Sequence, residues 1–355
     1  MFDLADRISA FGLLGQFLGQ YEKENNADEL KKLNQFFLAG LRENIQQAGI
    51  YNNWFTRDNT EFALQQWSEA LSAQNLEAWT QRYPADHFNQ DPRTIAIIMA
   101  GNIPMVGFHD LLSVLLSGHK ALIKPSGDDK ILIPFICQVL VAIDRRFASR
   151  ITLADGRLTG FDAIIATGSN NSSRYFDHYF SKYPHVIRKN RTSVAMLNGN
   201  ETEAQLKNLS EDIFRYFGLG CRNVSKLYLP EGFDLDRLFK AFFQHKEVID
   251  NKKYGNNYDY NRAIYMMERQ AFLENGFMIL KESTKLHAPA SVVYYEFYAD
   301  EKELVEKKET LSSQLQCVVG NPELDLCEAG FGQAQKPKLW DYADKVDILK
   351  FLRTV

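Results

Sequence analysis

Cys221 is the side chain of this 355-residue sequence with the clearest potential for chemistry. It follows Gly218 and Gly220, after a predicted helix and before a predicted strand, so a substrate carbonyl would have room to approach its sulfur. Nucleophilic thiolates need an exposed, polarising site of this kind. Many lone cysteines are instead small, inert core residues, and that interpretation stays open for Cys221.

Asn102, Lys124 and the run Thr167-Gly168-Ser169 each come at or just after the end of a short apolar run. An Asn amide at a strand end can donate to a developing oxyanion, and a Lys there can hold a ribose hydroxyl or a phosphate. A Thr-Gly-Ser turn before a helix offers N–H groups and hydroxyls to an anion. A turn asparagine and a plain helix cap remain the alternatives, because the usual glycine-rich dinucleotide and P-loop signatures are absent.

The elements that would position these residues alternate between strands and helices. Such alternation predicts parallel sheets, which bind ligands beyond the carboxyl ends of their strands. Up to residue 217 we expect strands at 94–100, 121–123 and 163–166, and helices at 109–116 and 131–143. Beyond residue 217 we expect strands at 227–229 and 292–297, and helices at 235–243 and 261–274.

Four parts are predicted along the chain. Apolar residues from Leu30 to Ile45 recur at helical spacing, with Gly49 as the stop signal, so residues 1–92 should form a helical region that packs on the cofactor domain. The others are a nucleotide-binding domain at 93–217, a catalytic domain at 218–335 and a C-terminal segment at 336–355 that returns to the core.

Composition narrows the class of protein. The net charge is −4, and 24% of the residues are charged. Because nucleic-acid-binding proteins usually carry a basic surplus, we expect no nucleic acid partner. The apolar stretch 94–116 is interrupted by polar residues and is not a membrane span. The four cysteines lack the spacing of a zinc site or a disulfide framework, so we predict no metal and a cytoplasmic protein. The basic cluster 188–191 is either a solvated loop or a phosphate contact.

Taken in order, the segments resemble the aldehyde dehydrogenase superfamily, and above all its acyl-CoA reductase branch, the LuxC-type family. Asn102 in Gly-Asn-Ile-Pro is similar to the oxyanion Asn of Trp-Asn-Phe-Pro, and Lys124-Pro125-Ser126 to the Lys-Pro-Ser segment on the adenosine ribose. Thr167-Gly168-Ser169 resembles the turn at the pyrophosphate, and Gly218–Lys226 resembles the nucleophile segment. The resemblance covers about 94–351.

The resemblance implies an aldehyde dehydrogenase-like α/β fold, with a Rossmann-type parallel-sheet cofactor domain, a second α/β catalytic domain and a helical N-terminal region. It implies that Cys221 is the nucleophile and Asn102 the oxyanion donor. It assigns the coenzyme to Lys124, Ser126, Gly127, Thr167, Gly168 and Ser169.

Three departures from the superfamily pattern matter. Residues 185–197 lack the Glu that activates water in hydrolytic members, so an acyl-enzyme would survive for reduction or transfer to a thiol. Gly127 stands where NAD-preferring relatives often have a Glu, which favours NADPH and leaves NADH open. The Glu that usually grips the nicotinamide ribose has no clear counterpart near Glu282 and Lys285.

We therefore expect NADPH-dependent reduction of a fatty acyl thioester to the aldehyde through an acyl-cysteine. The alternatives are an aldehyde or semialdehyde dehydrogenase of the same superfamily, and a non-catalytic subunit that binds acyl groups or nucleotide. The resemblance also implies an acyl-activating synthetase as partner, and we expect a homo-oligomer. The sequence does not give the length of the acyl chain. It also does not tell whether coenzyme A or a carrier protein donates the acyl group.

Overall fold

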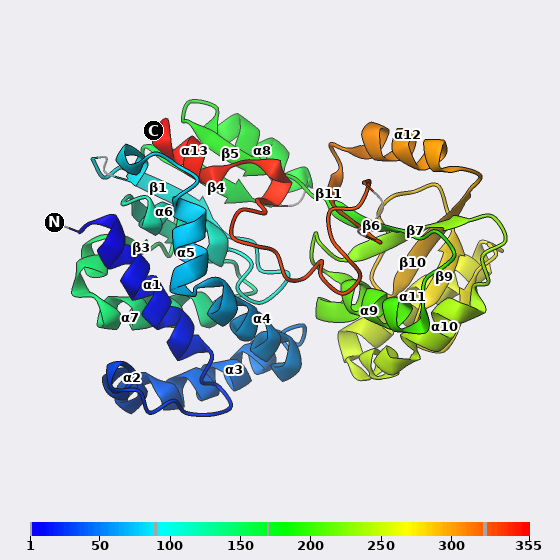
Figure 1. The fold of residues 1–355 in the computed structure, drawn as a ribbon, viewed down its shortest axis with the longest axis horizontal. Coiled ribbons are helices and arrows are strands. Elements are labelled where there is room, and N and C mark those ends of the chain that lie inside the picture. Colours follow the sequence, from blue (N-terminus) through cyan, green and yellow to red (C-terminus); the bar gives the residue numbers. More distant parts are fainter. Residues whose placement is uncertain (1, 89–90, 169, 322–324) are drawn as a thin grey trace. The chain divides into compact units, whose positions relative to one another are not determined.

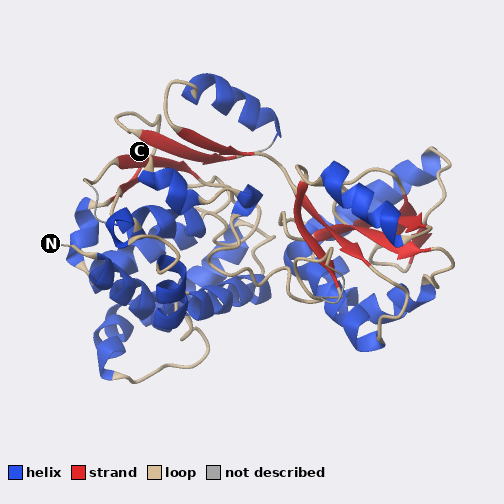
Figure 2. Cartoon of the chain, turned by 45° about the horizontal axis from the view of Figure 1, so that its top comes forward, coloured by secondary structure: helices blue, strands red, loops and turns tan. Residues whose placement is uncertain are grey.

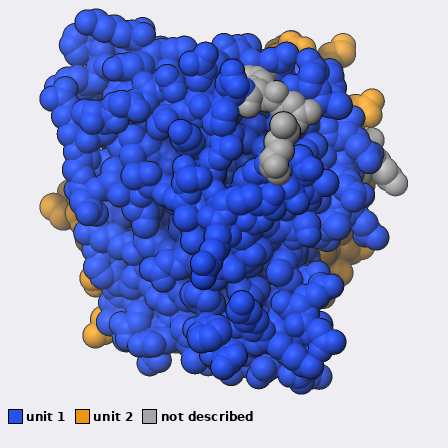
Figure 3. All heavy atoms as spheres, turned by 90° about the vertical axis from the view of Figure 1, so that its left-hand side faces the viewer, with its two compact units in different colours: residues 1–189, 338–355 blue, residues 190–337 orange. Residues whose placement is uncertain are grey.

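The chain forms two compact units in the computed structural model, which describes residues 2–88, 91–168, 170–321 and 325–355. Unit 1 comprises residues 1–189 and 338–355, and unit 2 comprises residues 190–337 (Figure 3). The change of unit at 189/190 comes earlier in the chain than the boundary expected near 217. The reason is that β6 (Thr192–Met196) pairs with strands of unit 2, and α9 (Glu203–Phe214) packs into the core of that unit.

Helices built on apolar residues at three- and four-residue intervals open unit 1 (Figure 1). Gly49 does not end a helix, contrary to expectation: a Cβ there would lie 3.0 Å from the Phe55 carbonyl oxygen, so the glycine serves a close approach. The elements are α1 (Leu4–Leu18), α2 (Asp28–Leu33), the π-helical turn η1 (Asn34–Leu38), α3 (Ala39–Tyr51), α4 (Arg57–Ala70), α5 (Ala73–Thr80) and η2 (Ala85–Phe88).

A five-stranded parallel sheet in the order β3-β2-β1-β4-β5 follows. The three predicted strands are confirmed as β1 (Thr94–Ile98), β2 (Lys120–Lys124) and β4 (Ala163–Thr167); β3 (Ile151–Leu153) and β5 (His185–Arg188) were not expected. The connecting helices are α6 (Phe108–Leu116), α7 (Leu132–Ile143), η3 (Arg145–Ser149) and α8 (Asn170–Phe180).

Alternate residues of this sheet enter two different cores, as strand geometry requires. Ile95 and Ile97 pack in the larger core with α1, α6 and α7, whereas Ala96 packs in the smaller core with Phe176 and Phe180 of α8. Helices therefore cover both faces (Figure 2). The C-terminal elements η6 (Ala343–Lys345) and α13 (Ile348–Arg353) return to unit 1, where α13 joins the larger core.

Unit 2 is built on a six-stranded sheet in the order β11-β6-β7-β10-β9-β8, parallel except for β8 and β9. A helix was expected at 261–274; the observed helix is shifted toward the N-terminus because the Asn251 side chain caps its first turn. Besides β6 and α9, the elements are η4 (Arg215–Gly218), β7 (Val224–Pro230), α10 (Asp236–Phe242), η5 (Phe243–Asp250), α11 (Lys252–Met267), β8 (Leu273–Glu274), β9 (Ile279–Glu282), β10 (Val292–Tyr298), α12 (Glu301–Leu311) and β11 (Leu315–Gly320).

The same alternation gives unit 2 two faces. Leu227 and Leu229 of β7 face the core that contains α9 and α10, and Tyr228 between them faces the core that contains Leu304 of α12. Helices on both faces of mostly parallel sheets confirm the predicted α/β class with a helical N-terminal region. Among the described residues, no helix is long and apolar enough to cross a membrane.

Candidate functional site

The carboxyl edge of the sheet in unit 1 collects most of the residues that the sequence singled out. The chain runs from β1 outward through β2 and β3, then crosses back to β4 and β5 on the other side of β1. Ile98 at the end of β1 pairs with Lys124 on one side and Ala166 on the other. Open α/β sheets bind their ligands at such a reversal of strand order. The segments after β1, β2 and β4 therefore leave the sheet at one edge, the edge at which folds of this type bind ligands.

The turn after β2 is largely exposed and carries a lysine at its start. The Lys124 and Gly127 positions are exposed, and a Cβ built at Gly127 meets no atom within 4 Å. Ser126 is half-buried and lies so close to Gly101 that a Cβ there would stand 2.6 Å from the Ser126 Cβ. An exposed ammonium group with open space beside it, such as that of Lys124, could bind a ribose hydroxyl or a phosphate. Asn102, which follows Gly101, is exposed as well.

The turn after β4 places a backbone segment close to helix α8. Thr167 and Gly168 are half-buried, and a Cβ on Gly168 would lie 2.8 Å from both Phe176 Cε2 and Ser172 Cβ. Glycine is therefore required for the chain to enter α8 at this distance. Backbone N–H groups at the start of a helix suit an anionic group such as a pyrophosphate. Ser169, the third predicted residue of this turn, lies outside the described residues.

The basic cluster 188–191 is not a simple solvated loop. Arg188 is 7% exposed, and its guanidinium forms an ion pair with the Asp110 carboxylate of α6, with a nitrogen–oxygen distance of 2.7 Å. A buried pair of this kind anchors structure, because removing one partner leaves the other charge uncompensated. The neighbouring His109 donates through Nε2 to the Leu339 carbonyl oxygen at 2.8 Å. One turn of α6 thus fixes the chain where it leaves unit 1 and where it returns.

Cys221 in unit 2 lies on a turn with an unusual backbone. Its side chain is half-buried, and the turn connects η4 to β7. Tyr216 (φ 55°), Phe217 (φ 58°) and Gly218 (φ 76°) adopt the left-handed conformation in succession. For residues other than glycine this conformation costs roughly 1–2 kcal/mol each. Strained backbone of this kind persists where the surrounding structure holds it, and it clusters at functional sites.

Asn223 is the residue that holds this turn. Its side-chain NH2 donates to three carbonyl oxygens, those of Arg215 at 2.8 Å, Asp212 at 3.0 Å and Ile213 at 3.3 Å. Its side-chain oxygen accepts from the Gly220 N–H at 2.8 Å. A single buried amide thus ties the end of α9 to the residue before Cys221. The Cys221 carbonyl oxygen accepts from the Ser193 hydroxyl at 3.1 Å, which fixes the other side of the turn.

The segment 330–335 lies against the same turn, and two side chains hold it. The Asp212 carboxylate accepts from the N–H groups of Gly332 at 2.6 Å and Ala334 at 2.9 Å. Arg222 Nε donates to the Ala334 carbonyl oxygen at 2.5 Å. Asp212 is fully buried, and this burial raises its pKa to about 7, although both N–H donors act to lower it. Arg222 directly follows the predicted nucleophile, so the segment and the turn are coupled.

We expect Asp212→Asn to flatten the dependence of the unfolding free energy on pH between about 4 and 7. Because folding raises the pKa of this carboxyl from 3.8 to about 7, the folded chain keeps a proton that the unfolded chain has released. Stability therefore falls as the pH rises through this window, by on the order of 4 kcal/mol from this group. Urea unfolding at a series of pH values measures the slope.

Glu211→Gln is the matched control for that experiment. The hydrogen bond from His245 and the charge of Arg215 lower the pKa of Glu211 to about 2, so this carboxylate is ionised in the folded and the unfolded chain above about pH 5. The slope should be unchanged in this variant over the upper part of the window. Equal slopes in wild type and Asp212→Asn would contradict the assignment.

The other cysteines are poor candidates for the nucleophile. Cys137 packs in the larger core of unit 1, and burial raises its pKa to about 12. Cys317 is buried in β11. Cys327 is half-buried, as Cys221 is, but desolvation raises its pKa to about 11. Thiolate character at neutral pH is therefore low at Cys137 and Cys327.

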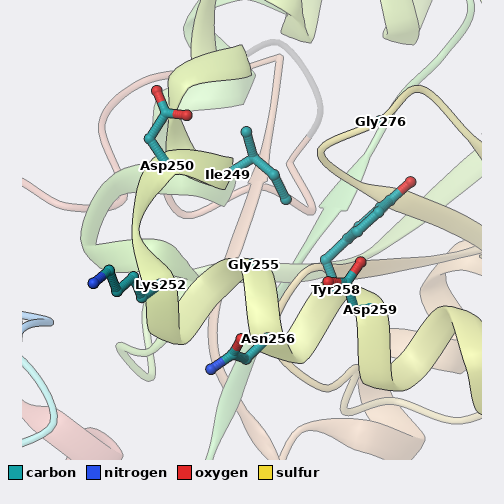
Figure 4. Close-up of a pocket in the computed structure, with 8 residues that line it drawn as sticks. All are labelled: Ile249, Asp250, Lys252, Gly255, Asn256, Tyr258, Asp259 and Gly276. Carbon is teal, nitrogen blue, oxygen red and sulfur yellow. The ribbon is translucent and has the colours of Figure 1, made fainter.

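Neither of two cavities in unit 2 forms a converging catalytic site. The larger one, of about 380 Å³, lies beside η5 and the start of α11, and its side chains Asp250, Lys252 and Asn256 point in different directions (Figure 4). A narrow pocket of about 20 Å³ lies next to the nucleophile turn, between Phe217, Tyr254 and the segment 288–293. This second pocket holds roughly one water molecule.

The aromatic residues close to the candidate turns belong mainly to the cores. Phe176 and Phe180 pack with Phe161 in unit 1, and Tyr216 is buried in unit 2. Phe217 is also buried, and it contributes to the narrow pocket beside the nucleophile turn. Among the described residues, no group of three or more His, Cys, Asp or Glu side chains could hold a metal ion.

Three buried polar residues that support the candidate site escaped the sequence analysis: Asp129, Asp212 and Asn223. Asp129 precedes the apolar run of α7 and accepts from the Leu132 N–H, so the signature of a helix start could have pointed to it. Asp212 and Asn223 bond to segments far along the chain or to carbonyl groups of a preceding turn. No local sequence pattern predicts these hydrogen-bond partners.

Comparisons with known proteins agree with this architecture. The model of the family described as acyl-CoA reductase (LuxC) matches residues 15–238. Aldehyde dehydrogenase 21 from Physcomitrella patens, solved with the reaction product succinate, is 11% identical, with a TM-score of 0.68 over 99% of this chain and 88% of that chain. An indole-3-acetaldehyde dehydrogenase solved with NAD⁺ is 12% identical, with a TM-score of 0.66 over 92% and 76%. No curated protein matches the sequence.

Proposed function

Because this chain belongs to the acyl-CoA reductase (LuxC) family, we propose that it reduces a fatty acyl thioester to the aldehyde through an acyl-cysteine on Cys221. The family match includes Asn102, the turns after β2 and β4, and Cys221. The aldehyde dehydrogenase fold supports an oxidoreductase that acts on aldehyde-related groups. The observation that carries the proposal is a half-buried cysteine on a strained, tightly held turn, with no carboxylate in the stretch 185–197.

In the first step the Cys221 thiolate attacks the thioester carbonyl carbon. The Asn102 side-chain NH2 and the Cys221 backbone N–H donate to the oxygen as it becomes negative. The tetrahedral intermediate expels the donor thiolate, which takes up a proton and leaves the acyl group on Cys221. Asn102 acts only as a donor, whereas Cys221 supplies both the sulfur and a backbone N–H; the new thioester bond forms in the addition, and the old one breaks when the intermediate collapses.

In the second step the acyl-cysteine must be reduced before water hydrolyses it. The nearby Asp212 carboxyl is fully buried, and its oxygens accept from Gly332 and Ala334, so it is not placed to activate water. A reduced nicotinamide held by the turns after β2 and β4 would supply the hydride at this stage. Hydride addition leaves a thiohemiacetal oxyanion on Cys221, which collapses to the aldehyde and expels the Cys221 thiolate.

Intact-protein mass spectrometry after mixing the protein with a long-chain acyl-CoA, without nucleotide, tests the proposal. We expect one acyl group added to the chain, and we expect NADPH to discharge it as the aldehyde. An acyl-carrier thioester is the second donor to be compared. Release of the free acid in place of the aldehyde would indicate a hydrolytic dehydrogenase. No adduct with either donor, together with no nucleotide oxidation, would indicate a binding subunit and overturn the proposal.

We propose NADPH as the preferred coenzyme and expect Gly127→Glu to reverse that preference. The Glu side chain enters open space, so the fold should not change, and its carboxylate repels a 2′-phosphate. The KM for NADPH should rise about tenfold or more while that for NADH stays the same. Gly127→Gln is the control of equal size without charge. A similar rise for both coenzymes in Gly127→Glu would show that the effect is steric.

A further inference from the structure

The loop 99–107, which carries Asn102, contacts the turn 124–129 as well as the helix α6 that follows it. The Met99 N–H donates to the Lys124 carbonyl oxygen at 3.1 Å. Gly101 lies on the turn so closely that a Cβ there would stand 2.6 Å from the Ser126 Cβ and 3.2 Å from the Asp128 Cβ. Two segments with different proposed roles, one for the oxyanion and one for the coenzyme, are therefore in direct contact.

Asp129 forms the strongest part of this connection. Asp129 is 3% exposed. Its Oδ2 accepts from the Met105 N–H at 3.0 Å, and its Oδ1 accepts from the Leu132 N–H at 3.3 Å. Burial raises the pKa of Asp129 to about 6, and the backbone N–H groups of Met105, Leu132 and Ile133 oppose that rise. A buried carboxylate held by backbone donors alone costs stability, so its position here calls for a reason.

Met105 gives that reason. It adopts the left-handed conformation with φ 58°, and its side chain is fully buried. An L-residue pays a conformational penalty for this backbone, and the bond to Asp129 offsets it. The conformation of Met105 reverses the chain between Asn102 and helix α6, because the Phe108 N–H donates back to the Met105 carbonyl oxygen at 3.0 Å. Loss of the Asp129 bond would therefore alter the path of the Asn102 loop.

We propose that Asp129 is a positioning residue for Asn102, which fixes the oxyanion donor to the same turn that would receive the coenzyme. This inference rests on the proposed function, since it assigns Asn102 to the oxyanion. Asp129 does not contact the reacting atoms. It acts through its hydrogen bonds to the Met105 N–H and to the start of α7. These bonds hold the Asn102 loop and the turn 124–129 in a fixed relative position.

The test is the rate at which Cys221 is acylated by a long-chain acyl-CoA without nucleotide, measured by quenched-flow mass spectrometry. Asp129→Asn keeps the size of the side chain but replaces one acceptor oxygen with an NH2, which cannot face a backbone N–H. We expect acylation to slow about 10- to 100-fold at saturating acyl-CoA, with an unchanged KM. Asp162→Asn, at an exposed carboxylate that accepts from the Thr94 N–H at the start of β1, should acylate at the wild-type rate.

A double variant separates positioning from general destabilisation. Asp129→Asn added to Asn102→Ala should cause little further loss, because residues that act through one another are not additive. A purely structural aspartate would lower the melting temperature, and its effect would add in full to that of Asn102→Ala.

The outcomes distinguish this inference from the proposed function. If wild type forms the acyl adduct and Asp129→Asn forms it at the same rate, the inference on Asp129 is wrong and the proposed function stands. Full additivity with Asn102→Ala would equally overturn it. If wild type forms no adduct with coenzyme A or carrier thioesters, the proposed function fails, and the inference fails with it.

Discussion

Cys221→Ala should abolish the acyl adduct and slow aldehyde formation by more than about four orders of magnitude. The reason is that no other thiol can take its place: Cys137 and Cys317 are buried, and the pKa of Cys327 is about 11. Alanine leaves the turn intact, because the bonds of Asn223 and Ser193 involve backbone or side-chain atoms that the substitution retains. Intact-protein mass with acyl-CoA and the rate of NADPH oxidation are the two measurements.

Cys327→Ala is the matched control, since Cys327 has the same half-buried class of exposure as Cys221. This variant should form the adduct at the wild-type rate. An adduct on Cys221→Ala, located by peptide mapping at Cys327, would mean that the nucleophile has been assigned to the wrong cysteine. Unaltered NADPH oxidation by Cys221→Ala without any adduct would remove covalent catalysis altogether.

The second large effect is expected for Asn102→Ala, which should slow acylation of Cys221 about 100- to 1,000-fold. The Asn102 amide is proposed to donate only when the carbonyl oxygen becomes negative, so the KM for the thioester should change little. The position is exposed and follows a glycine, so the truncation leaves no buried cavity. Single-turnover acylation over a range of acyl-CoA concentrations separates the two parameters.

Asn102→Asp serves as the control, because it keeps the size of the side chain and replaces the donor with a negative charge. It should be at least as slow as Asn102→Ala, since a carboxylate repels the oxyanion. Thermal melting of both variants should match wild type within about 2 °C, as surface changes normally do. A wild-type acylation rate in Asn102→Ala would show that another group stabilises the oxyanion.

Much of unit 1 could be predicted because its strands are continuous apolar runs. The runs at β1, β2 and β4 stand out from polar surroundings, as fully buried parallel strands do. Their order in the sheet could not be derived from periodicity, and yet this order places Asn102, Lys124 and Thr167 beyond one edge. The resemblance of the motifs supplied what local pattern could not.

The elements that were missed have physical reasons. Strand β5 ends in Arg188. From sequence alone its charge favours an exposed loop, because its buried ion-pair partner, Asp110, is not apparent. Strand β6 begins with two hydroxyl residues, Thr192 and Ser193, which bond to the nucleophile turn and its neighbour. Helix α11 begins with charged and polar residues, so its cap at Asn251 was overlooked. For the two strands a partner distant in sequence decides the outcome, whereas the cap of α11 is local.

Support for the candidate site was harder to foresee than its motifs. The motifs name the residues that would touch a substrate or a coenzyme, whereas Asn223, Asp212 and Asp129 bond to backbone groups of turns whose conformation is invisible in the sequence. The left-handed residues Tyr216 and Met105 are bulky, and bulky residues are the ones for which positive φ is least expected. Such supports emerge only when the backbone is known.

The insertion of unit 2 within unit 1 has a consequence for biosynthesis. Residues 190–337 are contiguous, but unit 1 needs α13, whose Ile348, Leu349 and Leu352 are fully buried in one core with β1 and α6. During synthesis from the N-terminus, unit 2 has emerged completely while the core of unit 1 still lacks this helix. The part of the chain that is translated first is therefore completed last, and its open apolar face is available to chaperones until residue 352 leaves the ribosome.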